Sequence, residues 1–222
     1  MVKLSRSEDV TTDSGASRAD WRAFDELELS PILVGALEAF REQGYHGTSV
    51  RDIAKRVGVT VPSLYYHYEN KQGMLVALLE VAMTEVRDRA RAAVAHAGDR
   101  VVDQFCNIVE GVVLHMTYRH GLAVLDTELR YLEPHNREHY ASRRKDLELL
   151  LQSIIKAGSA EGYFEVGNAE ITARALLGML QAVAGWYQPD GPLFPEEIAD
   201  EYVRIALRTV GARIRPSSLR TG

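Results

Sequence analysis

The sequence predicts an all-α protein with a compact N-terminal head and a longer helical body. From about residue 30, apolar side chains recur at helical spacing, and no segment alternates polar and apolar residues with the period of a strand. With 222 residues and a hydrophobic share of 46%, the chain can bury a substantial core. We expect a disordered tail and lead-in over 1–28, a small domain over 29–75 and a larger helical domain over 76–222.

The first two helices of the head have clear start signals. Ser30 can cap the first helix and Pro31 can occupy its first position, while Gly44 is a natural stop. The second helix begins at Ser49, and Asp52 three residues later completes the pattern of a capping box. These signals are local, so they predict the helix starts directly.

The next two helices follow with little connecting chain. Gly58 ends the second helix, and a very short third helix begins after Thr60 and ends near Tyr68. Asn70 then caps a fourth helix that continues to about His96. Glycine and proline breaks predict further helices in the body near 99–118, 122–131, 135–160, 168–187 and 195–213.

Composition excludes several classes of protein. The single cysteine, Cys106, cannot form an internal disulfide, and residues 1–20 lack the apolar stretch of a signal peptide. No segment approaches the roughly 18 consecutive apolar residues that span a bilayer. We expect a cytoplasmic protein without a membrane partner. A net charge of −5 means that any binding to nucleic acid depends on placed contacts more than on bulk attraction.

Residues 49–68 have the dimensions of a helix-turn-helix, with two short helices joined by residues 57–59. In such a unit, the second helix presents its N-terminal residues to base edges in the major groove of DNA. Leu64 and Tyr68 share one helical face and can dock on the core, which directs Ser63, Tyr66 and His67 away from it. Phenolic hydroxyls and a histidine N–H are good phosphate donors. Lys71, in the first turn of the fourth helix, predicts a phosphate clamp.

Residues 44–54, together with Gly58-Val59 and the run from Leu64 to Lys71, resemble the N-terminal signature of the TetR (tetracycline repressor) family. The resemblance covers roughly residues 30–79. It implies a nine-helix homodimer that binds double-stranded operator DNA through its first three helices. The family's usual DNA contacts fall here on Thr48, Arg51, Thr60, Val61, Pro62, Ser63, Tyr65, Tyr66, His67 and Lys71.

The resemblance also implies a pocket for a small-molecule effector among the fourth to seventh helices. We expect a hydrophobic effector, with His115 and Arg119 anchoring a polar or anionic end. Residues 186–199 are similar to the corresponding segment of family members that sense acyl-CoA thioesters, although Asp190 stands where some of those carry an arginine. The candidate pocket residues are Phe105, His115, Met116, Tyr118, Arg119, Met179 and Trp186.

By the same resemblance, the last two helices form the dimer interface. Both helices carry wide apolar faces, and small residues on the first of them permit close approach. The candidate interface residues are Leu176, Leu180, Val183, Tyr202 and Ile205.

Two alternatives remain open at this stage. We expect a repressor that its effector releases from the operator, but the family that the chain resembles also contains transcriptional activators. In addition, His135, Glu138 and His139 match the H-x-x-E-H pattern of zinc hydrolases, with Glu197 or Glu201 as a distant third ligand. The charged helix start after Pro134 instead favours a solvated first turn. We therefore expect no enzymatic activity, no catalytic or metal-binding residues and no cofactor.

Overall fold

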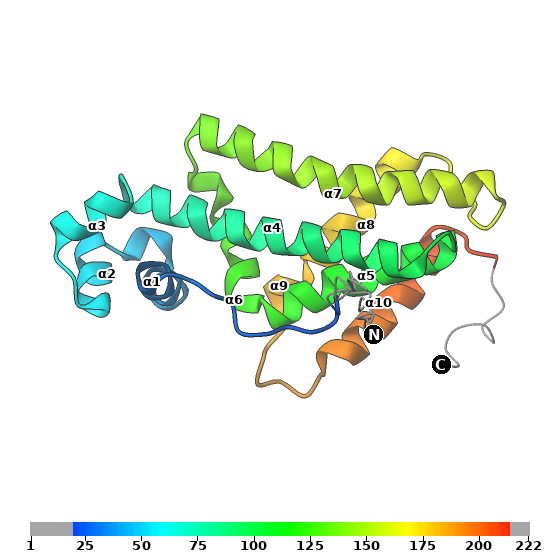
Figure 1. Cartoon of the computed structure of the whole chain (residues 1–222). Helices are drawn as coiled ribbons and strands as arrows, with labels where there is room; N and C mark the ends of the chain where they lie inside the picture. The colour runs from blue at the N-terminus through cyan, green and yellow to red at the C-terminus, as the bar shows by residue number, and fades with distance from the viewer. Residues whose placement is uncertain (1–19, 214–222) are drawn as a thin grey trace, which may run out of the picture.

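The computed structural model describes residues 20–213, and every regular element in that range is helical. A head of three helices lies at one end of an elongated molecule, and the helical body makes up the rest (Figure 1). The all-α prediction is confirmed. No helix within the described range is long and apolar enough to cross a membrane.

The head helices begin where their cap residues predict. The Ser30 hydroxyl accepts from the N–H of Leu33 at 3.3 Å, and Ser49 and Asp52 form a complete capping box. Gly58 ends the second helix with a φ of 72°, a left-handed conformation that favours glycine. The bounds are α1 (Pro31–Gly47), α2 (Val50–Val57) and α3 (Val61–His67).

The body departs from the predicted helices in three places. The segment 122–131 is a short α-helix followed by a 3₁₀ helix, the segment 168–187 breaks at Ala182, and the last helix ends at Thr209. The bounds are α4 (Lys71–Ala97), α5 (Val101–Tyr118), α6 (His120–Ala123), η1 (Val124–Tyr131), α7 (Pro134–Ala160), α8 (Ala169–Gln181), α9 (Val183–Trp186) and α10 (Pro195–Thr209).

Helix α4 links the two parts of the molecule. Its first turns pack on α1, and the rest of the helix lies along α5 and α7 (Figure 1). Helix α5 lies in the centre of the body, where it contacts α4, α7, α8 and α10. Its side chains form much of the core, and Phe105 is completely buried. A displacement of α4 is therefore felt at both ends of the protein.

The lead-in to α1 is packed on the body. Residues 1–19 lie outside the described range, but Trp21 is buried to 3% exposure and Phe24 stacks on Tyr118 with ring centres 4.8 Å apart. Arg22 pairs with Glu110 at 2.6 Å. Residues 20–29 thus follow the surface of the body before the chain enters the head (Figure 1).

Candidate nucleic-acid interface and effector body

The helix-turn-helix predicted for 49–68 is formed by α2 and α3. Ile53 and Leu64 have no exposed surface and join Phe40 in the core of the head. Helix α1 crosses α2 closely, because a Cβ added at Gly35 would lie 2.2 Å from a methyl carbon of Val57. The inner faces of α2 and α3 are thereby fixed, so their outer faces are presented rigidly to solvent.

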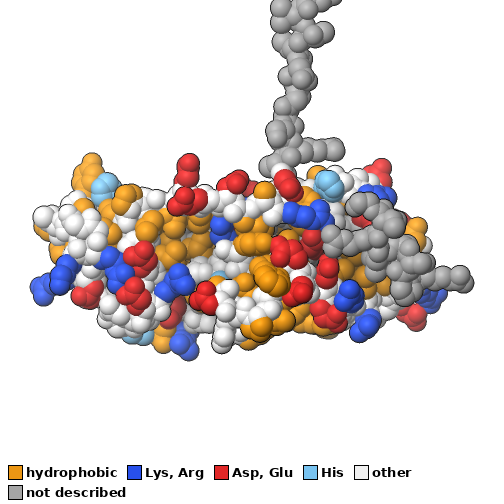
Figure 2. Space-filling view, turned by 90° about the horizontal axis from the view of Figure 1, so that it is seen from below, with side chains coloured by type: hydrophobic (Ala, Val, Ile, Leu, Met, Phe, Trp, Pro, Cys, Tyr) orange, Lys and Arg blue, Asp and Glu red, His pale blue; other side chains and the backbone are white. Residues whose placement is uncertain are grey.

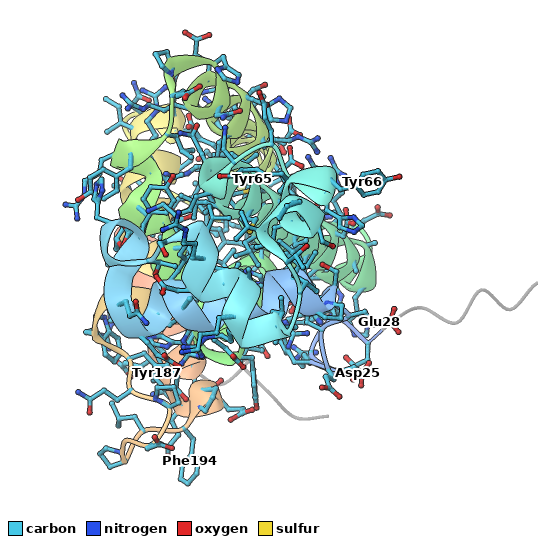
Figure 3. The ribbon with its side chains drawn as sticks, turned by 90° about the vertical axis from the view of Figure 1, so that its left-hand side faces the viewer. Asp25, Glu28, Tyr65, Tyr66, Tyr187 and Phe194 are labelled. Atoms are coloured by element: carbon cyan, nitrogen blue, oxygen red, sulfur yellow. The ribbon has the colours of Figure 1, made fainter. Side chains whose placement is uncertain are left out.

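The exposed face of α3 carries most of the side chains predicted to contact DNA. Tyr66 is 86% exposed and projects away from the ribbon, and Tyr65 is 51% exposed (Figure 3). The ring of His67 packs edge-on against that of Tyr66, with ring centres 5.2 Å apart. Pro62 is also exposed, while Val61 and Ser63 are half-buried.

Helix α2 and the start of α3 supply the remaining candidates. Arg51 is exposed and has no ion-pair partner among residues 20–213. Thr60 is the N-cap of α3, and its hydroxyl accepts from the N–H of Ser63 at 3.3 Å. Arg56, by contrast, is paired with Glu38 at 3.2 Å and with Glu42, so it braces α2 against α1. Basic and acidic side chains are interspersed at this end of the molecule (Figure 2).

Two predicted DNA contacts have different roles in this structure. Thr48 is 2% exposed, and its hydroxyl donates to the carbonyls of Ala39 and Gly44, both at 2.9 Å. The Lys71 ammonium donates to the carbonyls of Tyr45 at 2.6 Å and Thr48 at 2.7 Å. Burial lowers the pKa of Lys71. Because their polar atoms are used inside the head, Thr48 and Lys71 hold the interface in shape as the structure stands.

The candidate pocket residues of α5 are packed into the core. Phe105, His115 and Met116 are all buried. Burial lowers the pKa of His115 to about 4, and its Nδ1 has no hydrogen-bond partner in the described part of the chain. The sequence predicts these side chains to line an effector pocket, and they do not line either of the two hollows beside Tyr140.

From the sequence we expected Arg119 to anchor an anionic ligand, but its guanidinium already has partners within the protein. Its guanidinium donates to Glu85 at 2.8 Å and to the carbonyl of Asp25 at 2.7 Å. Burial alone would raise the pKa of Glu85, but hydrogen bonds from Arg119 and Arg89 lower it below its usual value. Arg119 therefore connects α4 and α5 to the lead-in.

The other candidate pocket residues lie towards the surface. The Tyr118 hydroxyl donates to Glu196, which raises the pKa of Tyr118 to about 12. Trp186 is 45% exposed and stacks on Tyr202, with ring centres 6.4 Å apart, and Met179 is half-buried. Tyr118 and Trp186 thus contact side chains of α10 near the surface.

Two hollows flank Tyr140, and sequence reasoning identified neither. A crevice of about 10 Å³ between α4 and α7 is lined mainly by apolar side chains, among them Val76, Leu79 and Met83. A larger hollow of about 280 Å³ lies between η1 and α7. Its lining residues are Leu129, Arg130, Arg137, Tyr140, Ala141 and Arg144.

The predicted dimer interface needs a correction. Leu176, Leu180 and Val183 are buried within the protomer, at 1%, 1% and 0% exposure, so they are core residues. Tyr202 and Ile205 on α10 are half-buried. The exposed face of α8 and α9 instead carries Ile171, Ala175, Gly178, Ala182 and Trp186, which follow one another at intervals of three or four residues.

The H-x-x-E-H segment does not gather a metal site. His135 lies 3.8 Å from Glu133, and His139 is turned to Glu80 at 2.9 Å. Among residues 20–213, no group of three histidine, cysteine, aspartate or glutamate side chains is placed to hold a metal ion. The pattern lies on the solvated first turns of α7, as the charge density there favoured.

Comparison with known proteins agrees with this architecture. Residues 32–78 match the family described as bacterial regulatory proteins, tetR family, and residues 98–210 match the tetracyclin repressor-like C-terminal domain. The HTH-type transcriptional repressor KstR2 of Mycobacterium tuberculosis is 26% identical over 200 residues, which is 88% of this chain and 96% of KstR2.

Solved structures of the same kind superpose over most of the chain. A regulatory protein of the tetR family from Rhodococcus RHA1 has a TM-score of 0.76 and 28% identity, and covers 83% of this chain and 97% of its own. AibR in complex with isovaleryl coenzyme A and operator DNA has a TM-score of 0.71 and 26% identity, and covers 78% of this chain and 95% of its own. Since the two family matches span both the head and the body, this chain belongs to the TetR family of DNA-binding transcriptional regulators.

Proposed function

We propose that the protein is a homodimeric repressor that binds a near-palindromic operator and is released by an acyl-CoA thioester. The observation that carries the DNA-binding part is the exposed face of α3. Tyr65, Tyr66 and His67 gather polar, phosphate-compatible groups on a helix whose other face is fully packed. Such an arrangement presents donors rigidly to a major groove.

The proposal assigns the DNA contacts to the side chains that are available for them. Arg51 and Tyr66 contact the phosphate backbone, and Ser63 and Val61 at the start of α3 lie against base edges. Lys71 and Thr48 act indirectly, because their hydrogen bonds fix the turn between α1 and α2 relative to α4. The N-terminus of α4 still offers backbone N–H groups to a phosphate.

Dimerisation through α8, α9 and α10 is supported by the row of small residues on α8. A Cβ added at Gly178 would meet no atom within 4 Å, so nothing in the protomer covers this position. Small side chains allow two helices to approach closely. A two-fold dimer places two α3 helices on successive major-groove faces of one operator.

The choice of effector is supported by two observations. AibR, a structural relative, binds isovaleryl coenzyme A together with operator DNA. In this chain, an apolar crevice and a hollow with three arginines lie on either side of Tyr140, which suits a ligand with an acyl chain and phosphate groups. The crevice is nearly closed, so an acyl chain must bind a state in which α4 and α7 are further apart.

The contacts at the start of α4 give this movement a route to the DNA. The side-chain oxygen of Gln72 accepts from the N–H of Glu133 at 3.0 Å and from the amide of Asn136 at 2.7 Å. An opening between α4 and α7 therefore displaces the first turn of α4, which is attached to α3. The effector releases DNA only if it binds this displaced state more tightly.

Operator binding with and without thioesters tests the proposal. Fluorescence anisotropy with DNA from the region upstream of the protein's own gene should show a tight complex. Acyl-CoA thioesters of increasing chain length should then be tested, and we expect them to dissociate the complex. Calorimetry should then show that operator weakens thioester binding by the same factor, as linkage requires. Absence of binding to any upstream DNA would remove the repressor function. Dissociation by a cationic drug and by no thioester would replace the effector class.

A further inference from the structure

The hollow between η1 and α7 has the composition of an anion site. Arg137, Tyr140, Ala141 and Arg144 lie at positions i, i+3, i+4 and i+7 of α7, so they occupy one helical face. Arg130 reaches the same hollow from η1. Three arginines thereby line a volume of about 280 Å³.

None of these three arginines has a carboxylate within ion-pair distance in the described part of the chain. This distinguishes them from other arginines of the body, such as Arg87 with Asp146 and Arg174 with Glu148. Concentrated positive charge of this kind costs free energy through mutual repulsion unless an anion binds. The arrangement therefore favours a ligand with more than one negative charge.

Two of the guanidinium groups are held in place by hydrogen bonds to other parts of the protein. Arg137 donates to the carbonyls of Arg130 at 3.1 Å and Leu132 at 2.9 Å, and Arg144 donates to the side chain of Gln181. The third, Arg130, makes no side-chain hydrogen bond among residues 20–213 and lies over the ring of Tyr131, 4.7 Å from its centre. The site is thus partly preorganised, with two cations held by hydrogen bonds and one by an aromatic ring.

We propose that Arg130, Arg137 and Arg144 bind the phosphate groups of a nucleotide-linked effector, and that this binding is transmitted to the DNA-binding head. This inference rests on the proposed function and assigns a site within it. Guanidinium groups bind phosphate oxygens in pairs, and three of them match the charge of a pyrophosphate or a nucleotide bisphosphate. Leu129 and Ala141 supply apolar surface beside the phosphates.

The size of the hollow limits what it holds. Ligand pockets commonly measure about 300–1,000 Å³, so this hollow accommodates the phosphate end of a coenzyme A thioester and leaves the acyl chain outside it. The apolar crevice between α4 and α7 is the neighbouring space, since Tyr140 lines both. The hydroxyl of Tyr140 donates to Asp126 at 2.6 Å. Burial raises the pKa of Asp126, and the positive charge of Arg144 opposes this rise.

A short series of contacts joins the anion site to α4. Arg137 holds the junction between η1 and α7 through the carbonyl of Leu132, and the next residue, Glu133, donates its N–H to Gln72. An anion that draws the Arg137 guanidinium into the hollow weakens the first contact and frees the junction to move. Both the phosphate end and the acyl end of the ligand therefore act on the first turn of α4.

The test uses the intact dimer with coenzyme A, adenosine 3′,5′-bisphosphate and a long-chain acyl-CoA as probes in calorimetry. Arg130→Gln should weaken all three at least tenfold with only a small change in melting temperature, because among residues 20–213 this guanidinium makes no hydrogen bond and contacts only the Tyr131 ring as a cation over an aromatic face. Arg137→Lys should also weaken binding, since it keeps the charge but loses the paired donors. Lys156→Gln removes a charge from the far end of the same helix, and it should bind like the wild type.

The outcomes separate this site from the proposed function. Tight acyl-CoA binding that is unaffected by Arg130→Gln overturns the site and leaves the effector class standing. Binding of the bisphosphate that depends on the arginines, with no preference for acyl-CoA, supports the site and overturns the effector class. A loss of operator affinity in Arg130→Gln without any effector would assign the hollow to a DNA phosphate and overturn the site as stated.

Discussion

Lys71, the first residue of α4, donates a hydrogen bond of 2.6 Å to the backbone carbonyl of Tyr45 and lies 4.3 Å from the centre of the same residue's ring. The ammonium thereby joins the end of α1 to the start of α4, across the turn that precedes α2. Since only residues 68–70 connect α3 to α4, this contact fixes the position of α3 relative to the body. Lys71 therefore has a structural role in the head that does not depend on a DNA phosphate.

Replacement of Lys71 by methionine should weaken operator binding without changing its dependence on salt. The variant leaves the carbonyls of Tyr45 and Thr48 without their donor, which costs about 1–2 kcal/mol of stability for partly buried, charge-assisted hydrogen bonds. A true phosphate contact would instead lower the salt slope by about one unit. Anisotropy titrations over a range of salt concentrations distinguish the two roles, with the exposed Lys55→Gln as the control.

Tyr66→Phe should reduce operator affinity and leave the protein as stable as the wild type. The side chain is 86% exposed, so loss of its hydroxyl removes no contact of the folded protomer. A hydrogen bond to phosphate of about 1 kcal/mol in each half-site predicts a loss of roughly thirtyfold for a dimer. Tyr163→Phe, an exposed tyrosine after α7, should have no effect. Unchanged affinity in Tyr66→Phe would remove Tyr66 from the interface.

Gly178→Arg should produce a folded monomer that no longer binds the operator. The added side chain starts in open space within the protomer, and replacing glycine in a helix favours the helix by up to about 1 kcal/mol. In a dimer packed through α8, the same side chain separates the two copies. Light scattering measures the mass, and circular dichroism confirms the helices.

Leu180→Glu is the informative comparison for Gly178→Arg. Leu180 is buried in the protomer, so a carboxylate there should unfold the protein before it affects assembly. A folded monomer from Leu180→Glu, or an unchanged dimer from Gly178→Arg, would place the interface elsewhere.

His115 should make the protein less stable as the pH falls from about 6.5 to about 4. Burial lowers the pKa of the folded His115 to about 4, whereas an unfolded histidine titrates near 6.5. Between these values the unfolded chain binds a proton that the folded protein does not, so stability falls by up to about 1.4 kcal/mol per pH unit.

Urea unfolding at pH 7, 6 and 5 checks this expectation. His115→Gln should lose less stability over that range than the wild type does. His120, whose pKa is also lowered by burial, needs its own variant, His120→Gln, to separate the two contributions. Parallel pH profiles for the wild type and His115→Gln would contradict the assignment.

The helix starts were predictable because their signals lie within three residues of one another. Ser49 and Asp52 form their capping box through local hydrogen bonds alone, and Gly58 ends α2 by its backbone conformation. The exposed face of α3 followed from the same helical spacing, since the burial of Leu64 leaves Tyr66 outside.

The features that the sequence did not reveal depend on contacts between distant residues. Lys71 meets a carbonyl 26 residues away, and the apolar period of α8 identified Leu180 as inward-facing without showing that it faces its own protomer. Arg130 and Arg137 meet at the corner between η1 and α7, where Arg137 donates to the Arg130 carbonyl at 3.1 Å, and helical spacing does not predict such a corner. Trp21 lies in a polar segment, and its pocket is formed by residues of α4 and α5, including Gly111.

The packed lead-in limits how far the head can swing. Besides the contacts of α1 with α6 and of Tyr45 with Tyr131, two stretches of chain join the head to the body. One is α4, and the other is residues 20–29, whose last hydrogen bond to the body is the one that Asp25 accepts from Arg119. Only the chain from Asp25 to Ser30 spans the gap, and at full extension such a segment reaches no more than about 18 Å. Rotation of α1–α3 about α4 must therefore stop when this tether is taut, or else detach Phe24 from Tyr118. The lead-in thus sets the range of half-site separations that a dimer of this protein can reach.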